Sequence, residues 1–150
     1  MRIAVGSDHA GFELKEFVRP LLGGAGHEVI DVGTDSDQST DYPLHAANAA
    51  RMVAAGEADR AVIVSGSGVG VSIVANKLDG VRAVNARDVE EAEMSRRHND
   101  ANVLALAGRR LSEHDATAIV ERFLDTEFEG GRHQRRVDQI GAVERGEEPQ

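Results

Sequence analysis

The sequence contains no cysteine and no tryptophan, and aromatic residues make up only 3% of its 150 residues. Without cysteine the chain cannot form a disulfide, bind zinc through thiolates or use a thiol in catalysis. Hydrophobic residues still make up 41% of the chain, so we expect a core of Ala, Val, Ile and Leu. A chain of this length does not hold two separate cores, which predicts one domain over residues 1–150, with 146–150 frayed.

Positive charge is scarce as well, because 17 Lys and Arg face 26 Asp and Glu, for a net charge of −9. DNA, RNA and anionic lipid all attract basic surfaces, so we expect neither a nucleic acid nor a membrane as partner. No apolar run approaches the roughly 7–15 residues of a secretory signal or the about 20 residues of a membrane helix. We therefore expect a cytoplasmic protein.

Short β-branched runs alternate with segments of helical periodicity. Apolar residues at helical spacing run from Leu14 to Leu22 and from Ala116 to Leu124, and further helix starts are indicated at Pro43, Asp88 and Ser112. Alternation of this kind predicts an α/β fold of Rossmann-like type, a doubly wound five-stranded parallel sheet. Its strands are expected at Arg2–Ser7, His27–Val32, Arg60–Ser65, Val81–Ala86 and Val103–Ala107.

An extra C-terminal helix is expected from about Arg132 onward. Its apolar stripe, formed by Val137, Ile140 and Val143, is too thin for a core element. We expect this helix to pack against a neighbour such as another subunit. Arg132 and Arg136 lie four residues apart, so they share the helix face on which a phosphate would bind. Taken in isolation, these arginines are better interpreted as a solvated basic patch that balances an acidic chain.

Polar residues gather where the predicted strands end, which is where open α/β sheets bind ligands. Asp8 and His9 follow the first strand, and Ser65-Gly66-Ser67-Gly68-Val69-Gly70 ends the third. Alternating glycines allow positive φ and let backbone N–H groups converge on an anion. Val71 excludes the dinucleotide fingerprint, and no Walker lysine follows. Both features also have a purely structural interpretation. The loop can be a tight turn that needs glycine, and Asp8 can be a helix cap.

The histidines other than His9 lie in no recognisable ligand-binding motif. His98-Asn99 lies between a predicted helix and the fifth strand, and is also compatible with a helix C-cap. The remaining four have no carboxylate or histidine partner at ligand spacing, so we expect them on the surface and predict no metal site: His27, His45, His114 and His133.

From Ile3 to about Ile140 the chain resembles the ribose/galactose isomerase family of sugar-phosphate isomerases. The resemblance rests on seven ordered segments: Gly6–Phe12, Asp41–Pro43, Ser65–Gly70, Ala75–Lys77, Gly80–Ala83, Arg97–Asn102 and Gly131–His133. It implies interconversion of ribose 5-phosphate and ribulose 5-phosphate through ring opening and an enediolate, with no metal or cofactor. It also implies homodimers or homotetramers with active sites between subunits.

The resemblance further implies residue roles. His98 would help to open the furanose ring, and Asp8 and His9 would contact the sugar oxygens or phosphate. The loop from Gly66 to Gly70 would stabilise the enediolate, while Arg132 and Arg136 would hold the phosphate. The predicted catalytic residues are thus Ser65, His98, Asp8 and Ser67, and the predicted substrate-binding residues are His9, Tyr42, Gly66, Gly68, Gly70, Asn99, Arg109, Arg132 and Arg136.

This chain departs from the family at the catalytic base. The family uses a cysteine at the position of Ser65, or in a second branch a glutamate where this chain has Val71. Our hypothesis is that Ser65 relays the proton with support from the carboxylate of Asp8. Two alternatives stay open: an isomerase of another sugar phosphate (a hexose 6-phosphate or a four-carbon ketose phosphate), and a catalytically weakened sugar-phosphate binding protein. A receiver-like signalling domain is excluded, because Ser65 stands where it would need a phosphorylatable Asp.

Overall fold

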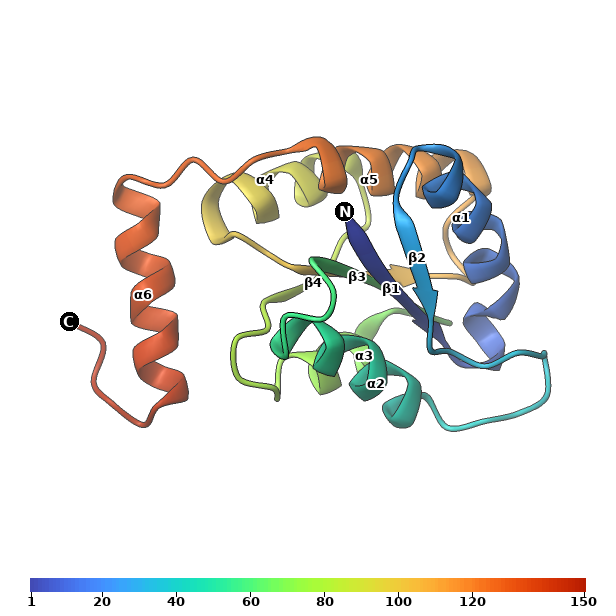
Figure 1. The fold of residues 1–150 in the computed structure, drawn as a ribbon, viewed down its shortest axis with the longest axis horizontal. Helices are drawn as coiled ribbons and strands as arrows, with labels where there is room; N and C mark the ends of the chain where they lie inside the picture. The colour runs from blue at the N-terminus through green and yellow to red at the C-terminus, as the bar shows by residue number, and fades with distance from the viewer.

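Five parallel strands form one sheet in a computed structural model of all 150 residues (Figure 1). The sheet order is β2-β1-β3-β5-β4, which confirms the predicted α/β fold. The two edge strands, paired on one side only, are shorter than expected from the sequence. The strands are β1 (Arg2–Ser7), β2 (Glu28–Asp31), β3 (Arg60–Ser65), β4 (Ala83–Asn85) and β5 (Val103–Ala107).

Six α-helices connect and extend these strands. The side chains of Asp88 and Ser112 accept N–H bonds at the starts of α4 and α5, and Pro43 lies in the first turn of α2, as predicted. A short 3-10 turn, η1 (His9–Gly11), precedes α1. The helices are α1 (Phe12–Gly24), α2 (Tyr42–Ala54), α3 (Val69–Ala75), α4 (Val89–Asn99), α5 (Glu113–Asp125) and α6 (Arg132–Glu144). None of them is long and apolar enough to span a membrane.

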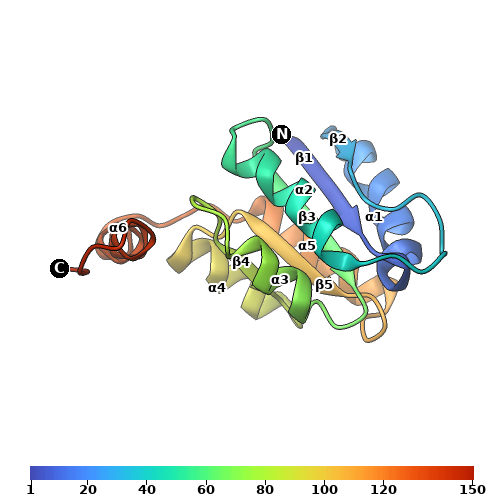
Figure 2. The same cartoon turned by 90° about the horizontal axis from the view of Figure 1, so that it is seen from below.

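The two faces of the sheet are packed differently. Helices α1, α4 and α5 cover one face, and α2 and α3 cover the other (Figures 1 and 2). The first face is filled by large side chains such as Leu104, Leu106 and Phe123. The second is rich in alanine, including Ala49 and Ala61, so α2 and α3 can approach the sheet closely. Two filled cores hold the carboxyl ends of the strands rigidly in place.

Helix α6 lies to one side of the sheet in both views (Figures 1 and 2), and it contacts the covering helix α4. Its end is tied to the body by Glu144, whose carboxylate accepts the N–H of Gly80 at 3.1 and 3.2 Å. Ile140 and Val143 remain 41% and 61% exposed. The predicted apolar stripe is therefore present and is not buried within this chain.

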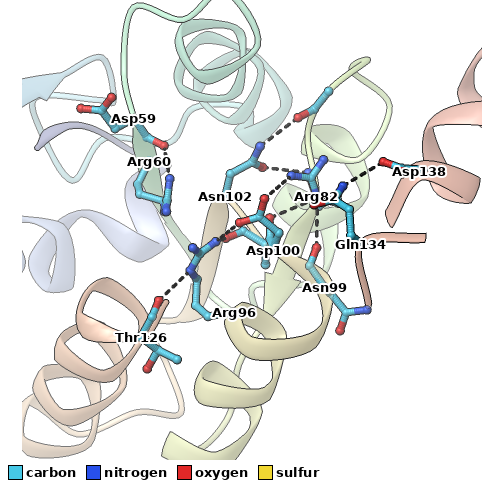
Figure 3. Close-up of polar contacts among 12 residues, drawn as sticks. Asp59, Arg60, Arg82, Arg96, Asn99, Asp100, Asn102, Thr126, Gln134 and Asp138 are labelled. Carbon is cyan, nitrogen blue, oxygen red and sulfur yellow. Dashed lines mark hydrogen bonds and ion pairs between the residues drawn. The ribbon is translucent and has the colours of Figure 1, made fainter. Parts of the chain in front are cut away.

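A network of charges shapes the turn between α4 and β5 (Figure 3). Asp100 ends α4 in the left-handed conformation with φ 48°. Its carboxylate accepts from Arg96 Nη1 at 2.8 Å and from Arg82 Nη2 at 3.4 Å. Arg82 Nε also donates to the carbonyl of Asn99 at 3.0 Å. These bonds hold the last residues of α4 in a single conformation.

Replacing this carboxylate is expected to destabilise the fold. Asp100→Asn keeps the side-chain shape and suits left-handed backbone, but it leaves the Arg96 side chain, 4% exposed, without its counter-charge. Asp100 is itself 35% exposed, so we expect a loss of about 2 kcal/mol, below the about 3–5 kcal/mol of a fully buried pair. Urea denaturation measures it, with the exposed Asp125→Asn as control. Equal stability of the two variants would contradict the structural role.

Candidate active site

The carboxyl ends of β1, β3 and β5 surround a cavity of about 370 Å³. Eight of the residues singled out from the sequence line it, together with two that were not, Ala10 and Arg110. The eight are Asp8, His9, Tyr42, Ser65, Gly66, Ser67, Gly70 and Arg109. Residues from distant parts of the chain thus converge because parallel strands end at one edge.

Asp8 and His9 are both held by local backbone. Asp8 is 6% exposed, and its Oδ1 accepts the N–H of Gly11 at 3.0 Å. Asp8 therefore both caps the 3-10 turn η1 and lines the cavity, so the two interpretations from the sequence hold together. His9 Nδ1 accepts the N–H of Thr40 at 3.1 Å, which leaves its Nε2 free of any protein partner. Both side chains keep one polar atom available for a ligand.

The glycine loop is shaped by close approaches. Gly68 adopts φ +74°, and a Cβ there would lie 2.4 Å from Asn85 Oδ1. A Cβ on Gly70 would lie 2.5 Å from the ring of Tyr42. Gly68 donates its N–H to Ser65 Oγ at 3.0 Å but does not line the cavity. The loop therefore folds around the Ser65 hydroxyl, whose oxygen accepts a hydrogen bond from the backbone N–H of Gly68.

Ser65 ends β3 and Asp8 directly follows the neighbouring strand β1, but the two side chains make no hydrogen bond to each other. The Ser65 hydroxyl is engaged with Gly68, and the Asp8 carboxylate with Gly11. The sequence led to the hypothesis that Asp8 supports Ser65 directly, but the two side chains are not in contact in the chain without substrate. The two groups share the cavity, so a substrate between them would contact both.

Asn85 is a residue that the sequence pattern did not single out. It ends β4, and its Nδ2 donates to the carbonyl of Ser67 at 3.1 Å. Its Oδ1 is buried and has no partner. Nothing in the sequence marks this asparagine, because its contact depends on how β4 is placed in the sheet.

Removing this support is expected to impair turnover rather than binding. Asn85→Ala loses the bond to the Ser67 carbonyl and opens space beneath Gly68. We expect kcat to fall about tenfold with KM nearly unchanged, because small displacements of catalytic groups are costly. Steady-state kinetics test this, with Asn85→Asp separating loss of the donor from loss of volume. Native kcat in both variants would show that Asn85 does not position the loop.

Two arginines at the cavity rim have no anionic partner. Arg109 packs against Gly66, where a Cβ would lie 3.3 Å from its Nη1. Neither Arg109 nor Arg110 forms an ion pair, although 13 pairs occur elsewhere in the chain. Unpaired guanidinium groups beside backbone donors favour an anionic ligand.

Four predicted site residues lie elsewhere. His98 and Asn99 end α4, and Arg132 and Arg136 lie in the first turns of α6. Helix α4 leads into β5, so its last residues stand at the amino end of that strand, opposite the cavity. Within one chain the structure therefore does not bring these four residues to Ser65.

The expectation that His133 is a surface residue was wrong. It is 7% exposed, and its ring stacks on that of His98 at 4.2 Å between centroids and 11° between planes. Burial lowers the pKa of His133, and the neighbouring His98 and Arg132 lower it further. Sequence spacing did not reveal the pair because its members belong to different helices.

Glu129 completes this second group. Its Oε1 lies 3.7 Å from His98 Nε2 and 2.7 Å from Arg97 Nε. Ligand atoms of His98, Glu129 and His133 lie within 4.8 Å of one another, a spacing that a metal ion could bridge. The stacked rings direct their nitrogen lone pairs side by side rather than toward one point, and Arg97 occupies the carboxylate. The arrangement fits a packed imidazole pair better than a set of metal ligands.

Comparisons with known proteins agree on one family. The model of the family described as Ribose/Galactose Isomerase matches residues 3–140. Ribose-5-phosphate isomerase B of Escherichia coli (strain K12) is 48% identical over 143 residues, which cover 95% of this chain and 96% of that protein.

Solved structures show the same similarity. Ribose-5-phosphate isomerase B of Clostridium thermocellum superposes with a TM-score of 0.96 at 45% identity, covering 97% of this chain and 99% of that one. The enzyme of Mycoplasma genitalium with bound ribulose-5-phosphate gives a TM-score of 0.92 at 38% identity, covering 96% of both chains.

Proposed function

Since the chain belongs to the ribose/galactose isomerase family, we propose that it interconverts ribose 5-phosphate and ribulose 5-phosphate at a site completed by a second copy of the chain. The observation that carries the proposal is the cavity where Ser65 and Asp8 meet unpaired arginines. The similar Mycoplasma genitalium enzyme, whose structure holds ribulose-5-phosphate, supports the choice of sugar.

The need for a second copy rests on the division of the predicted site. The cavity contains the Ser65 loop but lacks His98, Arg132 and Arg136. Beside it, α2 and α3 expose the apolar residues Leu44 and Ile73, at 59% and 55%. Contact between this surface and a second copy would bury them and would bring the α4 end and the α6 start of that copy to the cavity. A homodimer, alone or within a tetramer, provides two complete sites.

Ring opening is the first chemical step of the proposed reaction. His98 of the second copy takes the proton of the anomeric hydroxyl and gives it to the ring oxygen as the C1–O4 bond breaks. Arg132 and Arg136 of that copy hold the phosphate, and binding energy remote from the reacting carbons positions the open-chain sugar.

Proton transfer between C2 and C1 follows. Ser65 takes the proton from C2 while its own hydroxyl proton passes to Asp8 through a hydroxyl of the bound sugar that lies between them. The electron pair of the broken C2–H bond forms the enediolate. The backbone N–H groups of the glycine loop stabilise the negative oxygen. Ser65 then returns a proton to C1 and recovers its own hydroxyl proton from Asp8. The remaining hydroxyl proton moves from O2 to O1, and the ketose results. The N–H of Gly68, bonded to Ser65 Oγ, stabilises the developing alkoxide.

Turnover of a small panel of sugar phosphates tests the proposed activity. We expect the purified chain to isomerise ribose 5-phosphate with a kcat/KM at least about tenfold above that for an aldohexose 6-phosphate or a four-carbon sugar phosphate, a margin of about 1.4 kcal/mol in transition-state binding. A higher value for a hexose would favour the second candidate, and binding without turnover would favour the binding protein. A cytoplasmic location belongs to the proposal, because a sugar phosphate is too polar to cross a bilayer unaided.

A further inference from the structure

His98 is held by two side chains from outside its own helix. The ring of His133, on α6, stacks on one face at 4.2 Å. The carboxylate of Glu129, in the connection between α5 and α6, lies 3.7 Å from Nε2. An imidazole packed on one face and facing a charge at one edge has little freedom to rotate.

Glu129 is itself firmly placed. Arg97 Nε donates to its carboxylate at 2.7 Å, and the backbone N–H of Glu129 donates to the carbonyl of Arg97 at 3.1 Å. The hydrogen bond from Arg97 lowers the pKa of Glu129, so this group is a carboxylate at neutral pH. The connection to α6 is thereby joined to the end of α4 at the helix turn that carries His98.

The charged groups around His98 and His133 are mostly positive. Glu129 is the only carboxylate facing the two imidazoles, and the groups that surround them are Arg97 on α4, Glu129 in the connection, and Arg132 and Arg136 on α6. Burial, followed by His98, Arg132 and Arg136, lowers the pKa of His133, so its ring is uncharged at neutral pH when it stacks on His98. His133 thus offers a neutral surface rather than a second acid.

We propose that Glu129 and His133 are positioning residues for His98, with His133 setting the plane of the ring and Glu129 keeping the proton on Nε2. Nδ1 then carries the free electron pair that accepts the anomeric hydroxyl proton and afterwards returns it to the ring oxygen. At 3.7 Å the carboxylate acts on Nε2 through its charge rather than through a hydrogen bond, and this charge favours the tautomer that carries its proton on that nitrogen. The proposal rests on the ring-opening role of His98 proposed above.

Nitrogen-15 NMR of the imidazoles reports the tautomer without any need for activity. We expect the neutral His98 signal to show Nε2–H in the native protein and in the control Glu127→Gln, an exposed position in the same connection. In Glu129→Gln the Nδ1–H form gains population, and kcat for ribose 5-phosphate falls about tenfold or more with KM within about twofold. Glu129→Asp restores part of both effects, which a merely structural role would not do.

The stacking contribution has its own matched pair of variants. His133→Phe keeps a flat ring against His98, so kcat is expected to stay within about threefold of native, whereas His133→Ala loses about tenfold. Thermal melts of both establish that they are folded. If His98→Asn is fully active, the ring-opening role fails and the positioning role with it. If His98→Asn is inactive while Glu129→Gln keeps the native tautomer and kcat, the positioning role alone is overturned.

Discussion

Co-expression of the Ser65→Ala and His98→Asn variants is expected to restore about a quarter of native isomerase activity, although each variant alone is nearly inactive. In the proposed dimer each site takes residue 65 from one chain and residue 98 from the other. A mixed dimer therefore holds one site with both changes and one intact site. Random pairing makes half of the dimers mixed, and each mixed dimer has one intact site out of two. About a quarter of all sites are therefore intact, which corresponds to about a quarter of native activity.

The matched control pairs two changes from the same half of the site. Ser65→Ala with Asp8→Asn leaves one defect in each site of a mixed dimer, so no activity returns. Distinct affinity tags on the two chains isolate the mixed dimers, in which the intact site is expected to bring activity to about half of native. Tagged mixed dimers without activity would contradict a site shared between subunits and would return His98 to a role within one chain.

A series of changes at Ser65 is expected to have the second large effect. Ser65→Ala removes the proposed proton carrier, and we expect kcat to fall about a thousandfold, within the range of general acid–base catalysis. Ser65→Cys places a thiol with an ordinary pKa near 8.5 at the same point and is expected to retain turnover. Because the native chain has no cysteine, iodoacetamide should inactivate only the Ser65→Cys variant.

A cysteine at an exposed site provides the control for alkylation. Glu121→Cys on α5 is exposed and lies outside the cavity, so iodoacetamide should label it without loss of activity. Mass spectrometry confirms labelling in both variants. Native kcat in Ser65→Ala would remove Ser65 from the mechanism and would leave Asp8 as the nearest carboxylate to serve as base.

Much of the fold followed from local patterns. The strands at Arg2–Ser7, Arg60–Ser65 and Val103–Ala107 have the predicted bounds, because central strands are buried on both faces and are apolar throughout. The edge strands β2 and β4 were overestimated, since apolar residues there continue beyond the last paired residue. The cavity lining was predictable for the same topological reason: residues that follow parallel strands share one edge.

Contacts between distant helices were not predictable. The stack of His98 on His133 depends on where α6 begins and how the connection returns to α4, and no periodicity encodes that path. The support of Ser67 by Asn85 likewise needs the position of β4 at the edge of the sheet. The resemblance implied active sites between subunits, but the motifs did not say which chain would supply His98 or the arginines of α6.

The position of α6 to one side of the sheet has a consequence for how the enzyme responds to dilution. If the phosphate-binding arginines of α6 act only in a neighbouring molecule, an isolated chain has no competent site, and catalysis is linked to association by mass action. Specific activity should then decline as total protein falls below the dissociation constant of the dimer. Substrate, which contacts both chains at once, would strengthen their association and so protect activity at low concentration.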